Sequence, residues 1–126
     1  MNVFIVDDDI SVLELYKKFC KILGLNIIDK AKNGEEAVNK FQNFITKPDL
    51  IVMDYHMPGK NGLEATQAIL EMDKTAKIVI VSGDPTIKQK VLASGAICFK
   101  EKPLNLTQLH QQLNFFKNQI KSPVKC

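Results

Sequence analysis

Residues 50–62 read Leu-Ile-Val-Met-Asp-Tyr-His-Met-Pro-Gly-Lys-Asn-Gly, and this stretch decides the fold. Four consecutive apolar residues with no alternating polar partner are typical of a strand buried on both faces. The run stops at Asp54, and turn-forming residues follow it. Asp54 is therefore expected at the carboxyl end of a central strand, which is where ligands bind in open α/β sheets. Considered alone, an aspartate in this position more often only closes a strand at the surface.

The composition predicts one soluble domain. The chain has 126 residues, 45% of them hydrophobic, which is enough for a single core. Its apolar runs are far shorter than the roughly 20 residues that cross a bilayer, so we expect no signal peptide and no membrane insertion. The three cysteines are odd in number and lack C-x-x-C spacing. Their pattern argues against a disulfide framework or a zinc site and favours a reducing, cytoplasmic location.

The charge distribution gives little support to nucleic-acid binding. The net charge is +3, and all 17 basic residues are lysines. Arginine supplies the bidentate contacts that phosphate and guanine recognition usually use, so its absence weakens that function. The lysines are spread along the chain and are read as a solvated surface.

Five apolar runs alternate with five amphipathic segments along the chain. The predicted strands are Asn2–Val6, Leu25–Ile28, the run that ends at Asp54, Lys77–Val81 and Ala96–Phe99. This alternation predicts a doubly wound α/β fold, with a parallel sheet and helices on both faces. Strand order is not fixed by alternation, but sheets of this size most often take the order 2-1-3-4-5.

Helix-start signals precede the amphipathic segments. Ser11 and Glu14 suggest a capping box for the first helix, and Asn61 with Glu64 suggests one for the third. Asp84 followed by a proline is expected to start the fourth helix directly. The third helix is expected to bury Ala65, Ile69 and Met72, and the last helix, Asn105 to Ile120, to cover one sheet face.

Polar and charged residues follow the predicted strands where each strand ends. They are Asp7, Asp8 and Asp9 after the first strand, Asp54, Ser82 after the fourth, and Lys102 after the fifth. Carboxylates gathered at one sheet edge would repel each other by about 4 kcal/mol per close pair at an effective dielectric of about 20. Such a cluster needs a cation, and oxygen ligands without histidine or cysteine favour Mg²⁺.

A metal between Asp8 and Asp54 would leave one Asp54 oxygen free to attack a phosphoryl group and form an aspartyl phosphate. Lys102 and the Ser82 hydroxyl are suitable donors to the oxygens of the transferred group. Each has an ordinary alternative, since serines cap helices and most lysines are solvated. The pattern is persuasive because it recurs at several strand ends.

With these motifs in place, the chain resembles the receiver domain of two-component response regulators from Asn2 to about Ile120. The resemblance rests on Asp7-Asp8, Asp54-x-x-Met57-Pro58-x-x-x-Gly62, Ser82-Gly83 and Lys102-Pro103, in that order. It implies a (βα)5 flavodoxin-like three-layer sandwich, a receiver domain over residues 1–121 and a short tail over 122–126, without an output domain.

The resemblance also implies roles for individual residues. Asp54 would accept the phosphoryl group from a histidine kinase or a histidine phosphotransfer protein. Asp8 and Asp54 would ligate Mg²⁺, for which Mn²⁺ is a possible substitute, together with the backbone carbonyl of His56 and, through water, Asp7. Lys102 and Ser82 would contact the phosphoryl oxygens.

Further expectations concern switching. Ser82 and Phe99 would move together on phosphorylation, and Phe99 has no hydroxyl where many members have tyrosine. His56 and Asp84 would tune the lifetime of the phosphoryl group, and Asp9 would cap the first helix. A cis peptide is expected at Lys102-Pro103. The expected function is a signalling switch, not an enzyme, whose target binds the face formed by the fourth helix, fifth strand and fifth helix.

Two other functions have support in the sequence. Asp7-x-Asp9 suggests a phosphatase of the haloacid dehalogenase type, but the residues after Asp9 do not fit and the chain is short for that fold. A flavodoxin-like binding module is the other, and it gives no reason to gather acids at two strands. Turnover of a generic phosphate ester would favour the phosphatase.

Overall fold

The structure is a computed structural model, and it describes residues 1–102 and 106–119. Five strands alternate with five α-helices, and a short 3-10 helix precedes the fourth. In chain order the elements are β1 (Asn2–Val6), α1 (Ile10–Leu23), β2 (Asn26–Ala31), α2 (Gly34–Asn43), β3 (Leu50–Asp54), α3 (Gly62–Met72), β4 (Ile78–Ser82), η1 (Pro85–Ile87), α4 (Lys88–Ala93), β5 (Cys98–Glu101) and α5 (Leu106–Gln119). The predicted tail, residues 122–126, lies outside the described residues.

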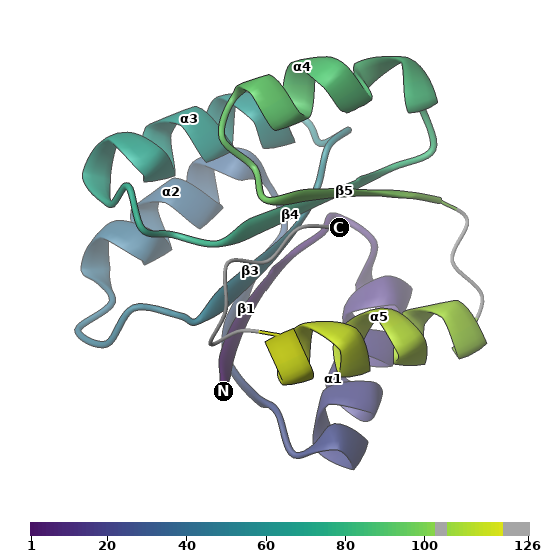
Figure 1. The fold of residues 1–126 in the computed structure, drawn as a ribbon. Helices are drawn as coiled ribbons and strands as arrows, with labels where there is room; N and C mark the ends of the chain where they lie inside the picture. Colours follow the sequence, from purple (N-terminus) through teal and green to yellow (C-terminus); the bar gives the residue numbers. More distant parts are fainter. Residues whose placement is uncertain (103–105, 120–126) are drawn as a thin grey trace.

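The sheet is parallel throughout and has the order β2-β1-β3-β4-β5, which confirms the predicted doubly wound topology. The helices α1 and α5 cover one face, and α2, α3 and α4 cover the other (Figure 1). β1 and β3 are neighbours, with Val6 beside Met53, so the carboxyl ends of both strands reach the same edge of the sheet. The three-layer sandwich is therefore confirmed.

The sheet separates two hydrophobic clusters. On the α2–α3–α4 side, Phe4, Phe41, Met53, Ile69 and Ile80 are essentially inaccessible to solvent. Burying a side chain of this size stabilises the fold by roughly 1.5–3 kcal/mol relative to leaving it exposed. β3 is buried along its whole length and contributes to both clusters. Asp54 thus extends a strand held on both faces.

The opposite cluster lies under α1 and α5. It includes Leu13, Tyr16 and Cys20 from α1 and Leu113 from α5. Leu113 of the helix predicted to cover the sheet is fully buried. The use of this helix to cover the sheet is confirmed at that position.

Several local predictions were wrong. The first helix has no Ser11–Glu14 box. The cap predicted at Asp9 is confirmed in its place, because the Asp9 side chain accepts from the Ser11 amide. Met72 is 43% exposed, because it lies in the last turn of α3 beyond the buried Ile69. η1 intervenes between Asp84 and α4, so the fourth helix does not begin as a regular α-helix.

The strand bounds also differ from the prediction. β2 continues to Ala31 and β5 to Glu101, beyond the apolar runs. Both are the edge strands of the sheet, where polar side chains are tolerated and apolar patterning is weaker. Pairing with β1 and β4 extends these strands further than their own composition indicates.

The cysteines differ from expectation at one position. Cys20 is free and buried, whereas Cys98 in β5 is disulfide-bonded. The C-x-x-C criterion therefore did not identify the disulfide at Cys98. In residues 1–102 and 106–119, no helix has both the length and the apolarity of a membrane span.

Candidate phosphoacceptor and metal site

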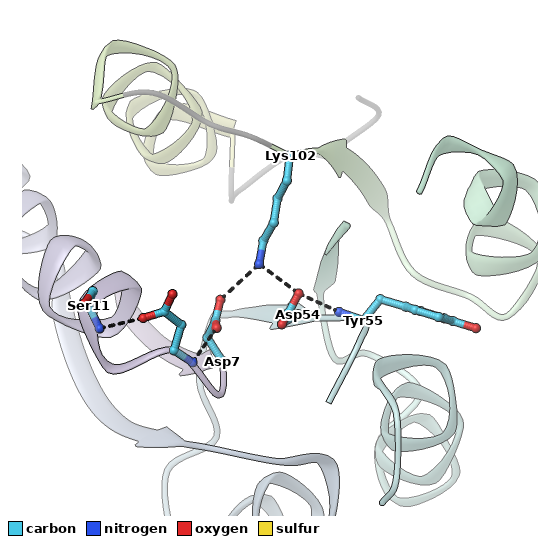
Figure 2. Close-up of polar contacts among 6 residues, drawn as sticks. Asp7, Ser11, Asp54, Tyr55 and Lys102 are labelled. Atoms are coloured by element: carbon cyan, nitrogen blue, oxygen red, sulfur yellow. Dashed lines mark hydrogen bonds and ion pairs between the residues drawn. The ribbon is translucent and has the colours of Figure 1, made fainter. Parts of the chain in front are cut away.

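Asp54 lies at the end of β3 in a largely enclosed position. It is 7% exposed, and its Oδ1 accepts a hydrogen bond from the Tyr55 amide at 3.0 Å. The same amide also donates to the Val81 carbonyl of β4 at 3.1 Å. The side chain is therefore oriented by backbone groups, while the Tyr55 ring points away from the carboxylates (Figure 2).

Asp7 comes from the neighbouring strand and is 3% exposed. Its backbone amide continues the sheet by donating to the Ala31 carbonyl, and its Oδ1 accepts from the Asp9 amide at 2.9 Å. Asp9 in turn caps α1 by accepting from the Ser11 amide. These successive contacts fix the turn between β1 and α1 and hold the Asp7 carboxylate beside Asp54.

Asp8 completes an acidic cluster with Asp7 and Asp54. One carboxylate oxygen of each lies within 4.8 Å of the others, and Asp8 is the exposed member. This is the juxtaposition that the sequence predicted for the first and third strands. Asp9 is not in the cluster and serves as a helix cap, which removes the basis for the Asp7-x-Asp9 phosphatase.

Lys102 reaches into this cluster from the end of β5. Its Nζ lies 2.9 Å from Asp54 Oδ1 and 3.5 Å from Asp7 Oδ2, between the two strands (Figure 2). The Lys102 amide also donates to the Ser82 carbonyl at 2.8 Å, which ties the lysine backbone to the end of β4. Pro103 lies outside the described residues, and so does the predicted cis peptide.

The electrostatics of the cluster are governed by burial and like charge. Burial raises the pKa of the Asp54 carboxyl, the Lys102 hydrogen bond opposes that rise, and the Asp7 charge adds to it. Burial also raises the pKa of Asp7, against the Asp9 amide and Lys102. For Lys102, burial would lower the pKa, but Asp54 and Asp7 together raise it. A cation bound among the three carboxylates would therefore stabilise their charged forms.

The residues present fit a small divalent ion. The donors are carboxylate oxygens from two strands, two of them buried and destabilised as anions, with the third open to solvent. Oxygen donors with one open side match the preference of Mg²⁺, which retains waters and shares phosphate ligands. In the metal-free arrangement the Lys102 ammonium supplies the positive charge.

Ser82 is placed near the cluster but is engaged elsewhere. It is 1% exposed, and its Oγ accepts from the Asp84 amide at 3.1 Å. It follows Val81, which pairs with Asp54 in the β3–β4 register. Ser82 therefore extends β4 by one residue beyond the level of Asp54, as the strand-end pattern predicts.

Phe99, His56 and Asp84 surround this edge without joining the ion-pair network. Phe99 is 9% exposed and packs in the cluster beneath α4. His56 is exposed, and its ring meets the Tyr55 ring edge-on at 4.8 Å. Asp84 caps η1 through Thr86, and the hydrogen bonds from Thr86 lower the pKa of its carboxyl.

Two features of the site have no sequence signal of the kind used above. The Tyr55 amide that orients Asp54 is a backbone group, and residue type does not reveal it. The close approach of Gly62 to Asp54 is the other: a Cβ at Gly62 would lie 2.4 Å from the Asp54 carbonyl oxygen. Glycine after a turn suggests such crowding, but only coordinates show what it approaches.

The fold and this edge define a class of protein: a doubly wound α/β domain with an aspartate, an acidic pair and a lysine at the switch between β1 and β3. Comparisons make the class specific. Residues 3–114 match the family model described as the response regulator receiver domain. The chain belongs to the response regulator receiver domain family.

Relatives of known name agree with this assignment. The chain is 33% identical over 115 residues to the chemotaxis protein CheY of Thermotoga maritima, covering 90% of this chain and 94% of that protein. It is 36% identical over 107 residues to protein-glutamate methylesterase/protein-glutamine glutaminase 3 of Hahella chejuensis, covering 82% of this chain but 30% of that enzyme.

A solved structure has the same fold. It is a chain of the CheX-CheY-BeF3-Mg²⁺ complex from Borrelia burgdorferi, with a TM-score of 0.84 and 33% identity. The match covers 93% of this chain and 89% of that one. Receiver domains are signalling switches, which is the coarse function that the comparisons establish.

Proposed function

We propose that this protein is a phosphoacceptor switch that takes a phosphoryl group onto Asp54 in a Mg²⁺-dependent reaction. The observation that carries the proposal is the gathering of the Asp7, Asp8 and Asp54 oxygens within 4.8 Å, with the Lys102 ammonium 2.9 Å from Asp54. The site thus combines a nucleophile, metal ligands and a cationic donor to phosphoryl oxygens.

The donor is a phosphohistidine of a histidine kinase or a histidine phosphotransfer protein. An Asp54 carboxylate oxygen forms a bond to phosphorus while the P–N bond breaks, and the imidazole nitrogen keeps the electron pair and takes up a proton. Oδ1 accepts from both Tyr55 and Lys102, while in the described part of the chain no hydrogen bond engages Oδ2. This difference supports Oδ2 as the attacking oxygen in the proposal.

The other residues have supporting roles in this proposal. Asp8, Asp54 and the His56 carbonyl would ligate Mg²⁺, or Mn²⁺ in its place, and Asp7 would act through a bound water. When bound, the ion neutralises charge on the transferring phosphoryl oxygens. Lys102 would shift from Asp54 Oδ1 toward those oxygens, and the buried Ser82 would exchange its Asp84 contact for one of them.

Switching then follows from packing. Ser82 ends β4, and Phe99 lies on the adjacent β5, paired with Ile80 two residues before Ser82, within the cluster that supports α4. In the proposal, a shift at Ser82 reaches Phe99 through this strand pair. The α4–β5–α5 face is the proposed docking surface for a target protein. His56 and Asp84 would tune the phosphoryl lifetime, and the cytoplasm is the proposed location, without nucleic-acid binding.

The test is direct phosphorylation. Incubation with Mg²⁺ and acetyl phosphate should add one phosphate mass, as the Asp54–P bond forms and acetate leaves. An Asp54→Ala variant should gain none. Asp49→Asn is the matched control, because Asp49 is an exposed aspartate just before the other end of β3. Phosphate on the Asp54→Ala variant, or none on the wild type, would contradict the proposal.

A further inference from the structure

The loop from Tyr55 to Asn61 connects the phosphoacceptor strand to α3 and is held at separate points. The Tyr55 carbonyl accepts from the Gly62 amide at 2.9 Å, and the Met57 side chain is buried in the core cluster. Between these anchors, His56 is exposed. Pro58 and Gly59 are exposed as well, and Asn61 is held by its capping box with Glu64. The stretch between Met57 and Asn61 has room for another support.

That support comes from the first residue of α2. Gly34 is buried, and a Cβ there would lie 2.3 Å from the Lys60 carbonyl oxygen and 2.9 Å from the Lys60 carbonyl carbon. Both are backbone atoms, which no side-chain rotation can move aside. Only glycine lets the start of α2 touch the loop backbone, with a Cα–H facing a carbonyl.

An added methyl group would displace the loop and not the helix. α2 is fixed by Ala37 and Phe41, which are both fully buried, and its start is capped by Asn33, which accepts from the Glu36 amide at 2.8 Å. The loop has an exposed stretch with a glycine at a φ of 72°, directly before Lys60. We therefore expect the loop, which is less tightly packed than α2, to move.

We infer that Gly34 is a positioning residue for the metal site: through Lys60 it holds the loop that carries the His56 carbonyl and leads from Asp54. The residue touches neither the phosphoryl group nor the ion. This inference rests on the proposed function, because it concerns the affinity for Mg²⁺. In this inference α2, which contributes no residue to the acidic cluster, supports the loop of the metal site.

The experiment compares Gly34→Ala with Gly24→Ala. Gly24 ends α1 with a φ of 73°, and a Cβ added there would have no atom within 4 Å, so alanine strains the backbone without touching the site. The Mg²⁺ dissociation constant is obtained from the rise in unfolding free energy with Mg²⁺ concentration. We expect Gly34→Ala to weaken binding about tenfold, and Gly24→Ala to change it by less than about twofold.

A second measurement needs no metal. Amide hydrogen exchange of Gly62, which donates to Tyr55, should speed up in metal-free Gly34→Ala relative to metal-free Gly24→Ala. Should Gly34→Ala not fold, Asn33→Ala frays the start of α2 without adding an atom. It should shift both readouts in the same direction by less.

Equal Mg²⁺ affinity and equal Gly62 exchange in the Gly34 and Gly24 variants would overturn the inference. A wild-type protein that binds no Mg²⁺ would instead contradict the proposed function. In that case the exchange comparison still decides whether Gly34 holds the loop.

Discussion

At the scale of single residues, the site depends on one lysine that joins groups far apart in sequence. Lys102 contacts Asp54 and Asp7, which are both nearly inaccessible to solvent. Two buried carboxylates on adjacent strands need a positive charge, and in the metal-free protein the ammonium provides it. Its side chain is 32% exposed, so solvent screens part of this interaction.

Replacing Lys102 with methionine should therefore lower the metal-free unfolding free energy by roughly 1–3 kcal/mol, because the carboxylates lose their counter-charge. Urea unfolding in the presence of a chelator measures this loss. Lys100→Met, in β5 two residues before Lys102 and half-buried, is the control and should change stability by less than about 0.5 kcal/mol. An equal loss in both variants would show that the ion pairs contribute nothing.

At the scale of elements, α1 buries two ionisable side chains beneath the sheet. Tyr16 is 3% exposed and Cys20 is 1% exposed. Burial raises the pKa of the Cys20 thiol to about 11. Burial also raises the pKa of Tyr16 above its ordinary value, and the charges of Asp7 and Asp54 add smaller contributions. Both side chains are neutral in the folded protein at neutral pH.

The sign of the resulting pH dependence follows from proton counting. Above the ordinary thiol pKa, an unfolded chain loses the Cys20 proton while the folded chain keeps it until about pH 11. Stability is therefore fully present below about pH 8.5 and falls as pH rises toward the folded value. Tyr16 acts in the same direction at higher pH.

We expect the unfolding free energy to drop by about 2 kcal/mol from Cys20 alone between pH 7 and pH 10. Urea unfolding at the two pH values measures the drop, and Cys20→Ala should have a smaller one although it is less stable at pH 7. The same drop in both proteins would show that the thiol does not contribute.

At the scale of the whole molecule, the proposed metal binding would be coupled to folding. The three carboxylates converge only when β1 and β3 pair, so the unfolded chain has no preformed site. A ligand that binds only the folded state stabilises it by mass action.

Mg²⁺ at 100 times its dissociation constant should raise the unfolding free energy by about 2.7 kcal/mol. Asp8→Asn should abolish this rise while leaving the metal-free stability within about 0.5 kcal/mol, since Asp8 is exposed. Asp49→Asn should retain the full rise. Persistence of the effect in Asp8→Asn would place the ion elsewhere.

The sequence by itself determined the layered fold and the acidic edge. Apolar runs ending in acids, as at Val6 and Met53, report burial and strand ends residue by residue, so local chemistry was enough. The glycine and cap at Asn61-Gly62 also marked the start of α3 correctly.

Only the tertiary structure decided the rest. The edge strands β2 and β5 extend because their neighbours pair with them. Lys102 reaches Asp54, and Gly34 reaches Lys60, across long stretches of chain. Such contacts depend on how the helices and strands pack against each other. The spacing of residues along one segment does not give the distance between residues of two different segments.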